Sequence, residues 1–353
     1  MRFGTFNYNQ GRAGVPEQQL FAELLDQLEL SERLGFHEAW FTEHHHSDYS
    51  LLPSPNLVIA AASQRTRRLQ LGNLVNVLPF HDPLRVAEEA ATLDLLTGGR
   101  LAVGVGRGIR RDEFEQYGFD TAVAQARFDE AVEVLLRAWT EERFSHAGRY
   151  WTYRDVSPRP RPLQRPHPPL YYGAISPASV DLVARRGWHL AQSRAPLDDV
   201  AATVARYRAA RAAAGLDPTG GRVVLAREIY VAETDEQARA EAQPALLRFW
   251  QLSNDNVLQT DPLGPEDLPR LTARLPYFRG GATFELFDAW GVTLIGSPET
   301  VAAKARAIVE TIAPTSLVGI FSFGTLTHEQ VCRSLELFAT HVIPALAPEP
   351  APA

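Results

Sequence analysis

Three consecutive histidines are the first residues in this sequence whose type and position could do chemistry. His44, His45 and His46 follow the apolar stretch AWFT and Glu43. The alternation of side chains along a strand places His44 and His46 on one face and His45 on the other. Burying three imidazoles is costly unless each has a hydrogen-bonding partner. The cluster therefore favours a functional role, whereas a single histidine at a strand end would leave a structural role equally open.

A second candidate is the glycine-rich segment LAVGVGRG at residues 101–108. Gly104, Gly106 and Gly108 let the backbone approach a ligand closely, and the guanidinium of Arg107 matches the paired oxygens of a phosphate. The spacing differs from the G-x-G-x-x-G of a dinucleotide-binding fold, which also lies in the first strand–helix unit rather than the fourth. The segment is either a phosphate contact or an ordinary glycine-rich turn.

The third candidate is the segment AISPAS at residues 174–179. Ser176 is typical of a helix N-cap and Pro177 of the first helical turn. Free backbone N–H groups at a helix N-terminus, together with the hydroxyls of Ser176 and Ser179, can bind phosphate. An ordinary helix start is the alternative. A similar Ser-Pro pair before Glu299 begins another helix, and its acidic residue would repel phosphate.

These candidates must be positioned by short apolar strands that alternate with amphipathic helical stretches, the pattern of a parallel α/β fold. The predicted strands are residues 2–8, 38–43, 69–78, 100–106, 169–175, 188–193, 222–232 and 316–324. The predicted helices are residues 16–35, 55–66, 83–99, 127–139, 176–187 and a last one through 335–346. Eight such units predict an α/β fold of the (β/α)8, or TIM, barrel type, with a doubly wound sheet as the alternative. The active site of such a barrel lies at the carboxyl ends of the strands, where all three candidates fall.

Two insertions interrupt this alternation. Residues 140–168, after the fourth strand, are rich in arginine, proline and aromatic residues and are predicted to form a long loop. Residues 253–283, after the seventh strand, contain four prolines and a Gly-Gly pair and are a candidate lid over the catalytic face. We expect residues 1–346 to form a single barrel domain and the tail 347–353 to be disordered.

Composition excludes several classes of function. The 353 residues are 45% hydrophobic and 22% charged, with a net charge of -7, so neither nucleic acid nor an anionic membrane is an expected partner. The chain has no run of about 18 apolar residues and no apolar N-terminal signal. Cys332 is the only cysteine, which fits a reducing cytoplasm. Lys304 is the only lysine and lies in an amphipathic helical stretch, so Schiff-base and pyridoxal phosphate enzymes are improbable.

A series of segments resembles the bacterial luciferase (alkanal monooxygenase) superfamily in order and spacing. The segments are RFGTF at the start, GFHEAWFTEHH (35–45), LGNLVNVLPFHDPLRVAEEAATLDLLTGGR (71–100), GVGRG (104–108), AISPAS (174–179) and SPETVAAKA (297–305). The resemblance covers nearly the whole chain. It implies a flavin in the mouth of the barrel, with its phosphate held by Arg107, Ser176 and Ser179, and His44 as the catalytic histidine that stabilises a C4a-peroxyflavin and assists proton transfer.

The same resemblance assigns further residues to the flavin. An aromatic residue near the ring corresponds to Trp250, and a non-prolyl cis peptide maps to Leu74-Val75. Gly106 takes the place of the reactive cysteine of luciferase, and Ile175 that of a glutamate that helps to bind phosphate. Gln192 and Arg194 stand where a tryptophan is expected after the sixth strand. These departures argue against light emission and long-chain aldehyde substrates, but not against flavin and oxygen chemistry.

The expected activity is oxidation of a small organic substrate by molecular oxygen and reduced FMN, supplied by a separate flavin reductase. A homodimer is expected to form through the apolar stretch PNLVIAAA (55–62), although this helix could simply pack on its own barrel. One alternative is a deazaflavin-dependent hydride transfer enzyme on the same fold. The others are a metal-dependent hydrolase that uses His44, His46 and His189, and a flavin-binding protein without turnover.

Overall fold

Eight parallel strands close into a barrel in the computed structural model, which describes residues 1–257 and 283–346. In barrel order the strands are β1 (Arg2–Asn7), β2 (Glu38–Phe41), β3 (Gln70–Val77), β4 (Leu101–Gly106), β7 (Leu170–Gly173), β8 (His189–Ser193), β9 (Val223–Val231) and β11 (Ser316–Ile320). The pairs β8–β9 and β11–β1 complete the ring. All eight strands coincide with predicted segments, so the (β/α)8 prediction is confirmed, and closure excludes the doubly wound sheet.

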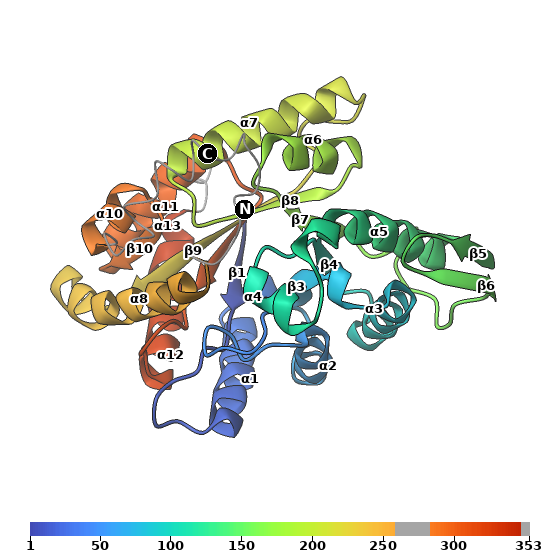
Figure 1. Ribbon diagram of the computed structural model, residues 1–353. Coiled ribbons are helices and arrows are strands. Elements are labelled where there is room, and N and C mark those ends of the chain that lie inside the picture. The colour runs from blue at the N-terminus through green and yellow to red at the C-terminus, as the bar shows by residue number, and fades with distance from the viewer. Residues whose placement is uncertain (258–282, 347–353) are drawn as a thin grey trace.

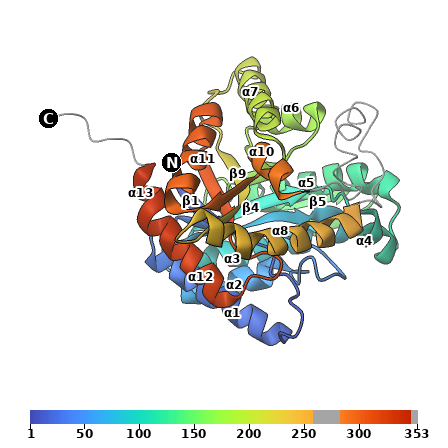
Figure 2. The ribbon, with the colours of Figure 1, turned by 90° about the vertical axis from the view of Figure 1, so that its left-hand side faces the viewer.

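Helices surround the strands (Figure 1), and on the side that Figure 2 faces, α8, α11 and α12 lie in front of the barrel. The α-helices are α1 (Glu17–Arg33), α2 (Pro55–Arg65), α3 (Pro83–Thr97), α4 (Arg111–Gln116), α5 (Ala124–Thr140), α6 (Pro177–Arg185), α7 (Leu197–Ala213), α8 (Asp235–Val257), α10 (Phe284–Ala289), α11 (Pro298–Ile312), α12 (His328–Leu337) and α13 (Ile343–Ala345). Two 3₁₀ turns, Leu78–Phe80 and Thr121–Val123, and a π-helical turn, Phe338–Val342, complete the helical elements. No helix among the described residues is long and apolar enough to cross a membrane.

Local sequence signals set the helix ends. The Ser176 side chain accepts a hydrogen bond from the Ser179 backbone at the start of α6, and Ser297 does the same with Thr300 at the start of α11. Gly98 ends α3 in the left-handed conformation, where a side chain would be strained. The predicted Ser-Pro helix starts are therefore confirmed.

The segment 140–168 differs from the predicted loop. It contains an antiparallel hairpin of β5 (Phe144–Ala147) and β6 (Thr152–Val156), seen in Figure 1 beyond the end of α5. The carboxylate of Glu130 on α5 accepts hydrogen bonds from the backbone N–H groups of Arg149, Tyr150 and Trp151, and so holds the turn. That acceptor lies outside the segment, so the segment's own composition did not indicate the hairpin.

A short strand, β10 (Thr293–Gly296), is a second feature that the sequence did not predict. It pairs in parallel with the end of β9, beyond the point where β9 leaves β8. The candidate lid, residues 253–283, lies almost entirely outside the described residues, and only its start belongs to α8. The tail 347–353 also lies outside them.

The seam between β3 and β4 shapes the mouth of the barrel. The register shifts between Asn73 and Asn76, and the peptide bond Leu74-Val75 is cis, as predicted. A Cβ atom at Gly104 would lie 2.2 Å from the backbone oxygen of Asn73, and one at Gly106 would lie 2.3 Å from a methyl carbon of Val75. Both glycines are therefore required by the close approach of β4 to the irregular part of β3.

The variant Gly104→Ala tests this constraint. We expect it to lower the free energy of unfolding by about 1–3 kcal/mol or more, because the added methyl group has no space beside a backbone carbonyl. Gly173→Ala is the matched control: it also lies in a barrel strand, but a Cβ there meets nothing within 4 Å. Urea unfolding of both variants measures the difference, and equal stabilities would contradict the steric argument.

Candidate active site

A cavity of about 320 Å³, open to solvent, lies at the carboxyl end of the barrel. Its walls come from β1, β3, β4, β7, β8 and β9 and from the loops that follow these strands and β2. This volume lies within the ~300–1,000 Å³ of a typical small-molecule pocket, so the cavity can hold a small-molecule ligand. Seven of the residues expected from the sequence to act in the site line it: His44, Leu74, Val75, Gly106, Arg107, Ser176 and Ser179.

The residues expected to hold phosphate, Arg107, Ser176 and Ser179, all line this cavity. Arg107 follows β4 and lines the cavity, and within the described residues it forms no ion pair or hydrogen bond. Ser176 and Ser179 follow the next strand, β7, at the start of α6, whose first turn contains no acidic residue. An uncompensated guanidinium beside a helix N-terminus favours a bound anion. This part of the cavity therefore favours an anionic group such as a phosphate.

His44 is held in one orientation by a buried carboxylate. Its Nδ1 lies 3.1 Å from Oε1 of Glu113 on α4, and its side chain is 17% exposed. The same Glu113 oxygen accepts a hydrogen bond from the backbone N–H of His45 and lies 3.4 Å from Nε of Arg110. Tyr8 stacks on the imidazole of His44 from the barrel side. The ring is thus fixed on the cavity wall.

The charges around His44 and Glu113 determine whether each side chain is ionised and which ring nitrogen of His44 carries the proton. Burial lowers the pKa of His44, as do Arg110 and Arg194, and Glu113 only partly opposes them. Burial alone would raise the pKa of Glu113, but the hydrogen bond and charge of His44, the charge of Arg110 and the His45 backbone outweigh it. At neutral pH a neutral imidazole therefore faces an ionised carboxylate, so Nδ1 donates to Glu113 and Nε2 keeps a free electron pair.

A second glutamate, Glu43, holds the rings of His45 and His81. Oε1 of Glu43 lies 3.1 Å from Nε2 of His45 and 2.8 Å from Nε2 of His81, and Oε2 accepts a hydrogen bond from the Val77 backbone. The hydroxyl of Tyr117 lies 3.0 Å from Nδ1 of His45. Burial alone would raise the pKa of Glu43, but its histidines and Val77 lower it. Glu43 therefore ties the end of β2 to the end of β3.

Trp250 is not among the residues that line the cavity. It lies on α8, stacked on Phe287 with ring centroids 4.6 Å apart, and the guanidinium of Arg194 lies 4.9 Å from its centroid. Arg194 also lies over Tyr8, which lines the cavity. Trp250 thus borders the cavity through Arg194 and Tyr8. Its contact with a flavin ring stays a prediction.

The histidines proposed for a metal do not converge. His189 is the first residue of β8 and therefore lies at the amino end of the barrel, opposite the end where His44 lies. Burial and the charge of Arg222 lower the pKa of His189 to about 4. The metal-dependent alternative needed His189 at the carboxyl end of its strand, whereas β8 begins at this residue. Within the described residues no group of three acidic, histidine or cysteine side chains could hold a metal ion.

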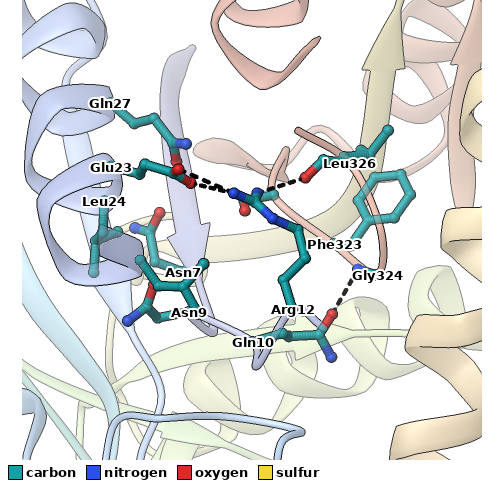
Figure 3. Close-up of a pocket in the computed structure, with 12 residues that line it drawn as sticks. Asn7, Asn9, Gln10, Arg12, Glu23, Leu24, Gln27, Phe323, Gly324 and Leu326 are labelled. Atoms are coloured by element: carbon teal, nitrogen blue, oxygen red, sulfur yellow. Dashed lines mark hydrogen bonds and ion pairs between the residues drawn. The ribbon is translucent and has the colours of Figure 1, made fainter. Parts of the chain in front are cut away.

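A small hollow beside β1 is filled by the protein's own groups (Figure 3). Arg12 donates two hydrogen bonds to the carboxylate of Glu23 on α1 and one to the Leu326 carbonyl, and Gln10 accepts a hydrogen bond from the Gly324 backbone. These contacts tie the loop after β1 to the loop after β11. The hollow therefore closes a seam of the barrel rather than holding a ligand.

Sequence reasoning missed Glu113 and Arg110 as site residues. Both lie in the segment that follows GVGRG, and both are almost fully buried although charged. Their proximity to the phosphate candidate Arg107 was a usable signal, because a loop after a barrel strand borders the active site. Their pairing with His44 was not visible in the sequence, because it joins residues 69 positions apart.

The fold and the place of this cavity match those of a known family of oxidoreductases. The chain belongs to the luciferase-like monooxygenase family, whose model matches residues 1–315. It is 30% identical over 247 residues to the oxygenase component of the flavin-dependent trigonelline monooxygenase of Acinetobacter baylyi, covering 69% of this chain and 68% of that protein. It is 26% identical to the FMNH2-dependent dimethylsulfone monooxygenase of Pseudomonas putida, covering 96% of this chain and 87% of that protein.

Solved structures give the same fold. Monooxygenase RslO1 from Streptomyces bottropensis superposes with a TM-score of 0.86 and 30% identity, covering 98% of this chain and all of that one. An F420-dependent secondary alcohol dehydrogenase, 20% identical, shares the fold with a TM-score of 0.74, covering 98% of this chain and 99% of that one. The fold therefore serves both flavin and deazaflavin enzymes.

The variant Glu113→Gln tests how His44 is held. Removing the carboxylate withdraws the interactions that raise the pKa of His44, so its pKa, already below the usual value, should fall further. NMR titration of the His44 ring, assigned with a His44→Gln variant, measures this shift. Glu115→Gln, on the exposed face of the same helix, is the control and should leave the titration unchanged. A rise in the pKa of His44 in Glu113→Gln would contradict this description.

Proposed function

We propose that this chain is the oxygenase of a two-component monooxygenase that uses reduced FMN and molecular oxygen to oxidise a small organic substrate. The observation that carries the proposal is that Arg107, the start of α6 and His44 line one cavity at the carboxyl end of the barrel. The trigonelline and dimethylsulfone enzymes, named for flavin and FMNH2, support the choice of cofactor. The words "oxygenase component" in the first of these names support a separate flavin reductase as partner.

Each wall of the cavity has a part in this function. Arg107, Ser176 and Ser179 hold the phosphate, and Leu74 and Val75 supply an apolar surface for the flavin ring, close to Gly106. The reduced flavin, when bound, supplies the electrons that activate oxygen. The protein's task is to exclude water and to control where protons go.

His44 acts as a proton acceptor in this proposal. Since Nδ1 donates to Glu113, Nε2 presents an electron pair to the cavity and can take a proton from a bound reactant or hold it by a hydrogen bond. The resulting imidazolium is stabilised by the Glu113 carboxylate and can then return the proton. This specifies the proton-transfer role that the resemblance implies for His44, because burial holds the resting imidazole neutral.

Deazaflavin-dependent hydride transfer is the second candidate. The shared fold of the F420-dependent dehydrogenase supports it, and the phosphate residues would serve either cofactor. Two findings favour FMN: the relatives named above for flavin and FMNH2, and the sequence Glu43-His44-His45 at the end of β2. The two cofactors differ in their reaction with oxygen, and this difference is measurable.

Anaerobic titration with reduced FMN, followed by rapid mixing with oxygen, tests the function. We expect micromolar or tighter binding, and an oxygen-dependent absorbance transient that precedes oxidised FMN and outlasts the autoxidation of free reduced FMN. His44→Ala should keep the flavin affinity and lose most of the turnover. Tight binding of oxidised deazaflavin without any oxygen-dependent transient would instead assign the chain to hydride transfer.

We also propose a homodimer through α2. Val58, Ile59 and Ala62 face the barrel and are buried, whereas Leu57 is 73% exposed on the outer face. The neighbouring helix α3 exposes Leu95 and Leu96. Exposed leucines on two neighbouring outer helices favour association with a second copy.

Leu57→Glu should shift this dimer towards the monomer, because a buried unpaired charge opposes association. Sedimentation velocity across a concentration series measures the change. Leu247→Glu, which changes an exposed leucine on α8 at the other side of the barrel, is the control (Figure 1). A wild-type protein that is monomeric at all concentrations would contradict the proposal.

A further inference from the structure

His44 presents one ring nitrogen to the cavity that has no partner in the protein. Its Nδ1 is occupied by the Glu113 carboxylate, 3.1 Å away, while the ring lines the cavity and its side chain is 17% exposed. Within residues 1–257 and 283–346, Nε2 forms no hydrogen bond, and it is not one of the fully buried polar atoms that lack a partner. A molecule in the cavity can therefore reach Nε2.

The protonation state of His44 makes this nitrogen an acceptor only. Because burial lowers the pKa of His44 and Glu113 is ionised, the single ring proton lies on Nδ1 and is donated to the carboxylate. A neutral imidazole of this tautomer offers an electron pair at Nε2 and no N–H group. A ligand at Nε2 must therefore donate a proton of its own, so a carbonyl or ether oxygen cannot be held there.

Charged groups on several sides of His44 act on a proton transfer to Nε2. Burial lowers the pKa of His44, Glu113 raises it, and Arg110 and Arg194 lower it further. Glu228 on β9 lies 3.5 Å from Nε of Arg194, and burial raises the pKa of Glu228, so it does not fully offset this cation. The two arginines therefore favour a negative oxygen beside Nε2, and Glu113 favours the imidazolium that receives its proton.

The acidity of the donor decides which hydroxyl group suits this site. A phenolic hydroxyl has a pKa of about 10, as the tyrosine side chain has, whereas the pKa of water is about 16 and aliphatic alcohols resemble water. Only the phenol is acidic enough to give its proton to an imidazole in a site that stabilises the products. In this step the O–H bond breaks, an N–H bond forms at Nε2, and the electron pair stays on oxygen. The ionised ring is richer in electrons and is then easier to oxidise.

The wall beside His44 suits the rest of an aromatic molecule. The ring of Tyr8 stacks on that of His44 with centroids 6.2 Å apart, and it lines the cavity together with Phe6, whose centroid lies 5.2 Å away. Val224 and Ala226 of β9 line the same cavity. An aromatic ring buries its apolar surface against such side chains, whereas the several hydroxyl groups of a sugar would lose their hydrogen bonds to water there.

We propose that the substrate is a small phenol whose hydroxyl group donates to Nε2 of His44, which takes the proton as the ring is oxidised. The oxidation rests on the proposed function, whereas the binding of the hydroxyl group does not. The proposal names the reactant from which His44 takes a proton. It excludes substrates without an acidic hydroxyl group, such as alkanes, ethers and simple ketones.

Spectroscopic titration with 4-nitrophenol tests the proposal, because only the ionised form of this phenol absorbs strongly in the visible range. The titration is done on the flavin-free protein and, by difference spectra, on the protein saturated with oxidised FMN. In both, the ionisation constant of bound 4-nitrophenol should be at least tenfold larger than that of the free compound. 4-Nitroanisole, which carries a methyl group in place of the hydroxyl proton, is the control and should bind at least tenfold more weakly.

Variants of the histidine and its carboxylate separate proton transfer from simple binding. His44→Gln keeps an oxygen acceptor but has no base, so the ionisation constant of bound 4-nitrophenol should return to within about threefold of the free value. Glu113→Gln leaves His44 in place as a weaker base, should lower the constant at least threefold from wild type, and keeps the test decisive if His44→Gln does not fold. Glu115→Gln, on the exposed face of α4, should behave as wild type.

Three results would overturn the proposal. The first is 4-nitrophenol that binds no more tightly than 4-nitroanisole, and the second is an ionisation constant that neither His44→Gln nor Glu113→Gln changes. The third is loss of the ionised form once FMN is bound, which would mean that the flavin itself occupies Nε2. Failure of the chain to bind FMN would instead count against the proposed function, and the titration of the flavin-free protein would still test the phenol.

Discussion

The close approach of β4 to the irregular part of β3 is the constraint on which this site depends. Glycine at 104 and 106 lets the two strands stay paired past the shift in register at residues 73–76. The backbone N–H of Gly104 also donates to the Asn73 side chain, at 2.8 Å. Because the seam is tight, Leu74 and Val75 face the cavity, and the chain leaves β4 in the direction that brings residues 107–113 over the barrel mouth.

Two buried glutamates then position the histidines of the site. Glu43 and Glu113 are almost fully buried, and each is shared among several donors, so neither is an isolated charge. Buried carboxylates persist only when such donors offset the loss of water. The same hydrogen bonds hold the rings of His44 and His45 in single orientations. The geometry of the histidine cluster is therefore a consequence of how the glutamates are satisfied.

Charge is unevenly distributed around the cavity. Arg107, Arg110 and Arg194 lie on or next to its wall, although the whole chain carries a net charge of -7. The overall acidity does not favour binding to nucleic acids or anionic surfaces, while the local cations favour an anionic ligand in the cavity. The net charge of the sequence cannot show this contrast, because residues far apart in the chain bring these arginines together at the cavity.

The sequence by itself determined the eight barrel strands, six of the helical segments and the Ser-Pro start of α6, but not α7 or α8. The cis peptide at Leu74-Val75 was mapped from the family resemblance. Strand and helix periods and caps are local, so a window of neighbouring residues contains the information. The family resemblance placed Arg107, Ser176 and His44, and the structure brings them into one cavity.

Only the tertiary structure decided which partners complete the site. Glu113 meets His44, His81 meets Glu43, and Glu130 folds the hairpin of residues 144–156, in each case across a loop or a whole strand–helix unit. Hydrogen bonds and ion pairs between distant segments carry no periodic signal, and so they become visible only when the barrel closes.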